Sequence, residues 1–233
     1  MGSPKLDFGV VCMFRGLILF WLFLTCVDPV LAGAWLRDQG SGFASASITL
    51  QRDNGDWSSE LSYYGDYGVS QSLTFGIDLN DADRLSGHAL IFARVSLDFL
   101  PPEHHLAAEI SLGGAHYRDA WKPMHKLTLS YGHGFDSSWA PGWLAIDGAY
   151  EKRGTSSQPI VKLDATIGLN AEDHLRPLLQ IETANISGHR LFYSITPSLQ
   201  IPLPRDSHLV IGLQHRMTTQ RSLGLKVGVW HRF

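Results

Sequence analysis

Cysteine is nearly absent from this chain. Only Cys12 and Cys26 occur among its 233 residues, and both lie in an amino-terminal segment that we interpret as a leader. A mature chain without cysteine has no disulfide, no thiolate nucleophile and no cysteine-based metal site. This composition suits export into an oxidising compartment.

Long hydrophobic runs and a strong net charge are also lacking. Beyond the leader no apolar run approaches the roughly 18 residues of a transmembrane helix, which excludes a helical membrane protein. The formal net charge of -3 offers no basic field for nucleic acid. A mean hydropathy of -0.03 resembles that of a soluble protein. A barrel that alternates apolar and polar residues in lipid has the same average.

The amino terminus has the layout of a secretory signal peptide. Lys5 and Arg15 precede the apolar run 17–27, and small residues follow at Ala32-Gly33-Ala34. The run is about half of the roughly 20 residues that a spanning helix needs. A cleaved signal peptide is therefore favoured over a permanent inner-membrane anchor. Cleavage after Ala32 or Ala34 fits, and the A-x-A pattern favours Ala34. We therefore expect a signal peptide at 1–34 and an outer-membrane β-barrel at 35–233.

Strand-like segments with period-2 alternation recur along the mature chain, separated by Gly, Pro, Asn, Asp or Ser clusters. They predict an all-β, antiparallel, up-and-down transmembrane β-barrel of about 12 strands, with 10 to 14 possible. An even count places both chain ends on one side of the membrane. The predicted strands are 42–51, 57–67, 71–79, 87–99, 105–117, 125–135, 143–151, 160–169, 175–184, 190–201, 208–216 and 221–233.

The alternation assigns charges of both signs to the inner face. Such charges are costly in a dry interior unless each is paired, and they are natural in a wet lumen. The favoured interpretation is an ion-pair network that fills a narrow barrel; a selectivity lining and a catalytic set are the alternatives. The lumen-facing candidates are Glu60, Asp66, Asp78, Arg94, Asp98, Glu109, Lys126, Asp147, Glu151, Lys162, Asp164, Glu182, Arg216, Lys226 and Arg232.

Aromatic residues gather near predicted strand ends, as expected for belts at the two membrane interfaces. They are Trp57, Tyr63, Tyr64, Tyr67, Tyr117, Trp121, Tyr131, Phe135, Trp139, Trp143, Trp230 and Phe233.

Catalytic and metal-binding patterns are weak. The chain has 11 histidines, but the closest pair, His104-His105, would serve one ion only if its turn bends, so we assign no metal site and no cofactor. Ser130 and His133 fall on opposite faces of one strand, and no G-x-S-x-G motif is present. We assign no catalytic residue.

The last residues, 221–233, alternate into a terminal phenylalanine. This ending resembles the carboxy-terminal signature of Gram-negative outer-membrane β-barrel proteins, except that His231 stands where an aromatic is more common. The resemblance implies that Phe233 is an assembly signal read by the barrel-assembly machinery, with outer-membrane lipids as the other partner. Residues 64–77 also resemble a strand-turn-strand unit of porin-like proteins and of a transporter family linked to phenol-degradation pathways.

Three functions remain open from the sequence. The first is a channel or transporter for small solutes or hydrophobic compounds. The second is a structural or lipid-interacting barrel with a plugged lumen. The third is a membrane-embedded lipid hydrolase or acyltransferase, which would need a Ser-His pair on the lipid face near one rim.

Overall fold

The computed structural model describes residues 33–53, 55–171, 175–218 and 221–233. Within these ranges no helix is long and apolar enough to cross a membrane. The predicted signal peptide, except for Gly33 and Ala34, lies outside the described residues.

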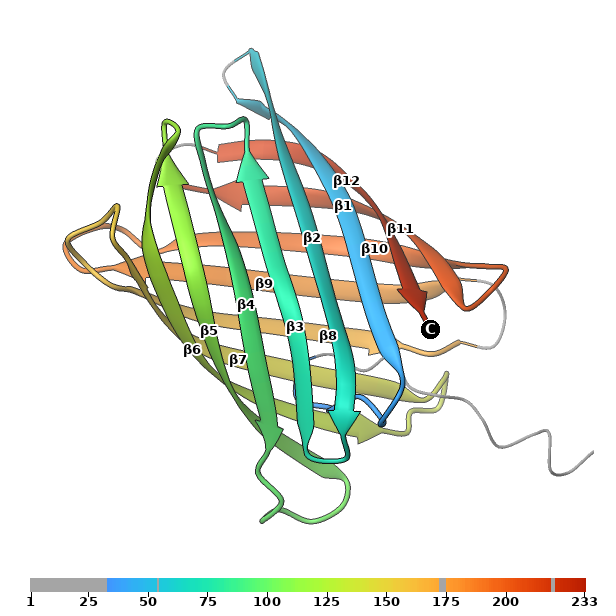
Figure 1. Cartoon of the computed structure of the whole chain (residues 1–233). Helices are drawn as coiled ribbons and strands as arrows, with labels where there is room; N and C mark the ends of the chain where they lie inside the picture. Colours follow the sequence, from blue (N-terminus) through green and yellow to red (C-terminus); the bar gives the residue numbers. More distant parts are fainter. Residues whose placement is uncertain (1–32, 54, 172–174, 219–220) are drawn as a thin grey trace, which may run out of the picture.

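Twelve antiparallel strands form one closed barrel in which each strand pairs with its neighbours in the chain, and β1 pairs with β12 (Figure 1). The prediction of a twelve-stranded up-and-down barrel is confirmed. The strands are β1 (Gly42–Asp53), β2 (Asp56–Ser70), β3 (Leu73–Ala82), β4 (Ser86–Ser96), β5 (His104–Tyr117), β6 (Ala120–Phe135), β7 (Gly142–Arg153), β8 (Ile160–Leu169), β9 (Arg176–Ile186), β10 (Phe192–Leu203), β11 (Ser207–Met217) and β12 (Arg221–Arg232).

The barrel closes where the two ends of the chain meet. Gly42 N donates to Phe233 O at 2.6 Å, and Phe233 N donates to Gly42 O at 3.0 Å. The carboxy terminus therefore lies beside the start of β1, at the end of the barrel that also carries the β2–β3, β4–β5, β6–β7, β8–β9 and β10–β11 connections (Figure 1). We call this end the terminal end and the other the distal end.

The connection between β5 and β6 is shorter than the sequence indicated. The predicted strands 105–117 and 125–135 leave a connection between them that is centred on 119–123. In the structure, Tyr117 pairs with Ala120 around a two-residue turn at Arg118 and Asp119, whose φ angles are 49° and 64°. Two successive left-handed residues are typical of a type I′ hairpin, which matches the strand twist. Pro123 lies within β6, opposite Gly114.

The wall is polar inside and apolar outside. Ser111 and Glu151 are 0% and 2% exposed, whereas Ile91 and Leu223 on the outer face are 67% and 70% exposed. Burying these outer side chains in lipid is favourable, and leaving so many of them in water is not. The distribution is that of a transmembrane β-barrel, inverted relative to a soluble protein.

Candidate functional site

A cavity of about 560 Å³ lies inside the barrel. Inward side chains of β1 to β9 and β12 line it, together with Gly33 and Arg37 from the segment before β1. Its charged lining residues are Arg37, Glu60, Asp78, Arg94, Glu109, Lys126, Asp147, Glu151, Arg153, Lys162, Asp164 and Glu182. We call this cavity the lumen.

Arg94 is the centre of an ion-pair network on one side of the lumen. Its Nη2 donates to Glu109 Oε2 at 2.6 Å and to the Tyr64 hydroxyl at 2.8 Å. Its Nη1 lies 3.6 Å from Asp66 Oδ2, and Arg37 Nε donates to Asp66 Oδ1 at 2.7 Å. These side chains are almost fully buried, so each charge depends on its partners to offset the loss of hydration.

Lys126 extends this network toward the distal end. Its Nζ donates to Asp78 Oδ2 at 2.8 Å and lies 3.9 Å from Glu109 Oε1. His88 Nε2 is 3.1 Å from the other oxygen of Asp78. The chain of contacts from Arg37 to His88 therefore joins β2, β3, β4, β5 and β6 with the amino-terminal segment.

Two smaller groups of charged side chains also form ion pairs on the inner face of the barrel. Glu151 accepts from Arg153 Nη2 at 2.7 Å and lies 3.1 Å from Lys162 Nζ. Glu60 pairs with Arg216 and accepts from Asn80 at 2.8 Å.

Three carboxylates on neighbouring strands differ from the rest, and we call them the acid row: Asp147 on β7, Asp164 on β8 and Glu182 on β9. Asp147 and Asp164 are direct partners in the β7–β8 ladder. Asp164 accepts from the Thr183 backbone nitrogen at 2.8 Å, and Glu182 accepts from a serine hydroxyl on β10 at 2.7 Å. Within the described ranges, none of the three forms an ion pair. Adjacent like charges repel, so this wall of the lumen favours a cation.

The segment before β1 turns into the barrel at its terminal end. Arg37 N donates to Thr74 Oγ1 at 3.1 Å, which fixes the backbone against the inner face of β3. Trp35 is 7% exposed and meets Trp143 edge-on with ring centroids 6.5 Å apart. Ala34 and Trp35 pack with inward apolar residues of β7, β9 and β11 into one cluster. The segment therefore narrows the lumen at this end.

Most of the residues that were predicted to face the lumen do line it in the structure. Ten of the predicted residues line the lumen: Glu60, Asp78, Arg94, Glu109, Lys126, Asp147, Glu151, Lys162, Asp164 and Glu182. Arg216 lines a smaller adjoining cavity, and Lys226 reaches the lumen residue Gln180, to which it donates at 3.2 Å.

Asp98 does not line the lumen. Its position was assigned by continuing the alternation of a strand over 87–99, but β4 ends at Ser96. Asp98 is exposed in the connection to β5 and accepts from the Ser96 hydroxyl. The following Pro101-Pro102 cannot continue a ladder, and the strand ends well before it.

Three aromatic residues assigned to the interfacial belts lie inside the barrel instead. Tyr64 hydrogen-bonds to Arg94, Trp143 is 1% exposed, and Trp230 lines the lumen. The sequence did indicate the position of Tyr64. It lies an even number of residues from Glu60 and Asp66 in the same strand, so period-2 alternation places all three side chains on one face. Trp57 and Trp139 do lie exposed on the outside, at 70% and 88%.

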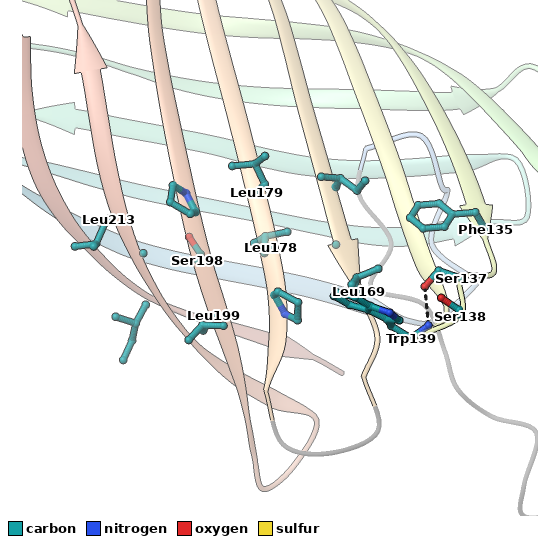
Figure 2. A pocket seen from close by; sticks show the side chains of 16 residues that line it. Phe135, Ser137, Ser138, Trp139, Leu169, Leu178, Leu179, Ser198, Leu199 and Leu213 are labelled. Atoms are coloured by element: carbon teal, nitrogen blue, oxygen red, sulfur yellow. Dashed lines mark hydrogen bonds between the residues drawn. The ribbon is translucent and has the colours of Figure 1, made fainter.

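A larger hollow of about 930 Å³ lies in the apolar wall near the terminal end (Figure 2). Its lining has no charged residue; Trp139, Leu169, Leu179, Leu199 and Leu213 are among the side chains around it. Pro177 and Pro197 lie within it, on paired strands. A surface of this composition suits lipid chains rather than a polar solute.

Comparison with known proteins identifies the architecture. No protein-family model matches the chain, and no curated protein matches it. The fold is similar to the NanC porin, with a TM-score of 0.60 at 6% identity over 80% of this chain and 98% of that one. It is also similar to the KdgM porin in complex with disordered oligogalacturonate, with a TM-score of 0.56 at 10% identity over 81% and 99% of the two chains.

A third similar structure is an outer membrane channel from Pseudomonas putida F1. Its TM-score is 0.50 at 12% identity, over 89% of this chain and 100% of that one. The fold is thus that of outer-membrane β-barrels of the porin type. At these identities the similarity concerns the fold, and the chemistry of the lumen follows from this chain's own residues.

Proposed function

We propose that this chain is an outer-membrane channel for small hydrophilic solutes, exported by means of a cleaved leader. The observation that carries the proposal is the lumen itself, a cavity of about 560 Å³ lined by charged side chains within a wall that is apolar outside. A hydrophilic solute keeps polar contacts along such a lining, whereas a hydrophobic compound would displace water from charged groups without replacing its hydrogen bonds. The hydrophobic-compound version of the channel is therefore the less favoured one.

The charges of the lumen further favour cations and amine-bearing solutes. The basic residues Arg94 and Lys126 each contact carboxylates, which reduces their attraction for a passing anion. The acid row has no such compensation among the described ion pairs. The oligogalacturonate of the similar KdgM complex is a polyanion, which this row would repel.

Planar-bilayer recording of purified, refolded protein tests the channel. We expect discrete conductance steps, with a reversal potential in a salt gradient that indicates cation preference. Ser45→Arg on β1, whose side chain lines the lumen, should lower the step size. Protein that migrates as a folded barrel yet gives no steps would overturn the channel and support a plugged barrel.

The plugged barrel is the second candidate, and one observation favours it. The segment at Gly33–Arg37 lies inside the terminal end, where Arg37 ties it to Asp66. A lumen held closed by this segment would serve a structural or lipid-interacting role.

The lipid hydrolase is less well supported. A Ser-His pair does occur on the outer face at the terminal rim, where Ser207 Oγ lies 3.0 Å from His231 Nδ1 across the β11–β12 ladder. The same hydroxyl also donates to Arg205 O at 3.2 Å. No described carboxylate hydrogen-bonds to His231, so the orienting third group of a catalytic triad is missing from the described part of the chain.

We further propose that outer-membrane lipids surround the apolar wall and that the barrel-assembly machinery acts on Phe233. The exposed outer apolar side chains and the pairing of Phe233 with Gly42 at the closing seam support these partners.

A further inference from the structure

Gly33 lies in the lumen, well inside the barrel. A Cβ placed on it would be 3.0 Å from Asp147 Oδ1 and 3.2 Å from Ser130 Oγ. Both groups are inward side chains, and they are direct partners in the β6–β7 ladder. The backbone of Gly33 therefore reaches the first member of the acid row.

One oxygen of the Asp147 carboxylate lacks a hydrogen-bond donor. This atom, Oδ1, is inaccessible to solvent and makes no hydrogen bond in the structure. A buried carboxylate oxygen without a donor is unfavourable, so a group that supplies both a proton donor and a positive charge would be stabilised here. Among the described residues, no lysine, arginine or histidine forms an ion pair with it.

We infer that the leader is cleaved between Ala32 and Gly33 and that the new α-ammonium group of Gly33 binds in the lumen to Asp147 and Ser130. This inference rests on the proposed export and leader removal. Hydrolysis by the export peptidase breaks the Ala32–Gly33 amide bond: hydroxide from water goes to the Ala32 carbonyl carbon, and the Gly33 nitrogen gains protons. Because an α-amino group has a pKa of about 7.7 to 8.0, the product carries a positive charge and three donors near neutral pH.

Cleavage after Ala34, which the A-x-A pattern favours, would give a different result. It would remove Ala34, which is 2% exposed within the apolar cluster, and would place a new charge on Trp35 beside Trp143. A charged amine in that cluster would lack a carboxylate partner and would lose hydration. Cleavage after Ala32 retains the small residue that the peptidase requires at the cleaved bond.

The consequence is that processing tethers the amino-terminal segment inside the lumen. With the leader attached, the Gly33 nitrogen is a neutral amide and cannot form an ion pair with Asp147. After cleavage, the segment 33–37 is held at both ends, by Asp147 at Gly33 and by Asp66 and Thr74 at Arg37. The ammonium group then offsets one of the three negative charges of the acid row.

The mass of the intact protein isolated from outer membranes tests the cleavage site. We expect a chain that starts at Gly33. A chain that starts at Trp35, or one that retains the leader, would overturn the inference. This result does not depend on conductance, so failure of the channel proposal and failure of this one are distinguishable.

The reactivity of the amine tests its binding site. The folded protein is treated with an amine-acetylating reagent near neutral pH, and labelling of the amino-terminal peptide is followed by mass spectrometry. We expect Gly33 to react about tenfold more slowly in the folded barrel than in the unfolded chain, a factor that corresponds to about 1.4 kcal/mol. Asp147→Asn should abolish most of this protection.

Asp164→Asn is the matched control, because it removes the same charge from the adjacent strand while leaving Gly33's contacts intact. It should leave the labelling rate nearly unchanged. Equal acceleration by both variants would show that the amine responds to the general charge of the lumen and would overturn the specific pairing. If Asp147→Asn does not assemble, Ser130→Ala supplies the second test of the same contact.

Discussion

Arg94 and Glu109 are direct partners in the β4–β5 ladder, and Arg94 Nη2 donates to Glu109 Oε2 at 2.6 Å inside the barrel. The exposed fractions of the two side chains are both 5%. A cross-strand ion pair in this position links two strands and also anchors Tyr64 and Asp66 around the same guanidinium. The wall of the lumen is therefore stabilised by the charges that line it.

Arg94→Ala should destabilise the barrel by about 3 to 5 kcal/mol, because it leaves the buried Glu109 without its closest partner and leaves Asp66 with Arg37 alone. Urea unfolding in lipid vesicles measures the loss. Adding Glu109→Gln should restore part of it, since the second change removes one unpaired charge. Arg52→Ala, which removes an exposed contact with Trp57 at the distal end, should cost less than about 1 kcal/mol. Equal losses in the two single variants would contradict a buried network.

Leu61→Arg should impair membrane insertion, whereas Ser62→Arg should not. Leu61 is 54% exposed on the outer face of β2, and Ser62 lines the lumen one residue later. An arginine near the bilayer midplane costs about 2 to 4 kcal/mol on the lipid face and much less in the lumen. Heat-modifiable migration of outer-membrane fractions measures insertion.

Single cysteines at the same two positions give an independent readout, because both natural cysteines precede the barrel. A lipid-phase quencher should reach a label at position 61 and not at position 62. The opposite result would mean that the strand is shifted by one residue.

The sequence was sufficient for the fold because period-2 alternation determines both the strands and their faces. Arg94 was assigned to the inner face of its strand, and the structure places it inside, 4% exposed. Asp98 was misplaced because alternation does not mark where pairing stops.

The amino-terminal segment could not be predicted from the sequence in the same way. Arg37 and Gly33 precede the first strand and belong to no periodic pattern, so only the three-dimensional arrangement brings them to Asp66 and Asp147. The pairing of charges across the lumen has the same origin. Arg216 and Glu60 are far apart in the sequence and meet only because the barrel closes.

Asp164→Asn combined with Glu182→Gln should lower the preference for potassium over chloride by about fivefold for each carboxylate removed. One carboxylate about 4 Å from an ion is worth roughly 1 kcal/mol in water, and two of the three acid-row charges are removed. Reversal potentials in a salt gradient measure the ratio. The effect should be larger at 0.1 M than at 1 M salt, where the Debye length falls from about 10 Å to about 3 Å.

Asp119→Asn is the control for that experiment, because Asp119 lies exposed in the β5–β6 turn at the distal end. It should leave the ratio nearly unchanged. A selectivity that follows Asp119 rather than the acid row would place the determining charge outside the lumen.

Removing Phe233 should reduce the amount of barrel in the outer membrane more than it reduces the stability of barrels that do form. Burial of one such side chain contributes about 1.5 to 3 kcal/mol, and its loss should leave most of the closing β1–β12 ladder intact. The deletion also removes both hydrogen bonds between Phe233 and Gly42, whereas Phe233→Ala keeps that backbone and loses only the ring that stacks on His231. If the assembly machinery reads the aromatic ring, the two variants should show similarly low outer-membrane levels in cells and should refold comparably in detergent. If the seam hydrogen bonds are what matter, Phe233→Ala should assemble normally and only the deletion should fail, an outcome that would contradict the assembly signal.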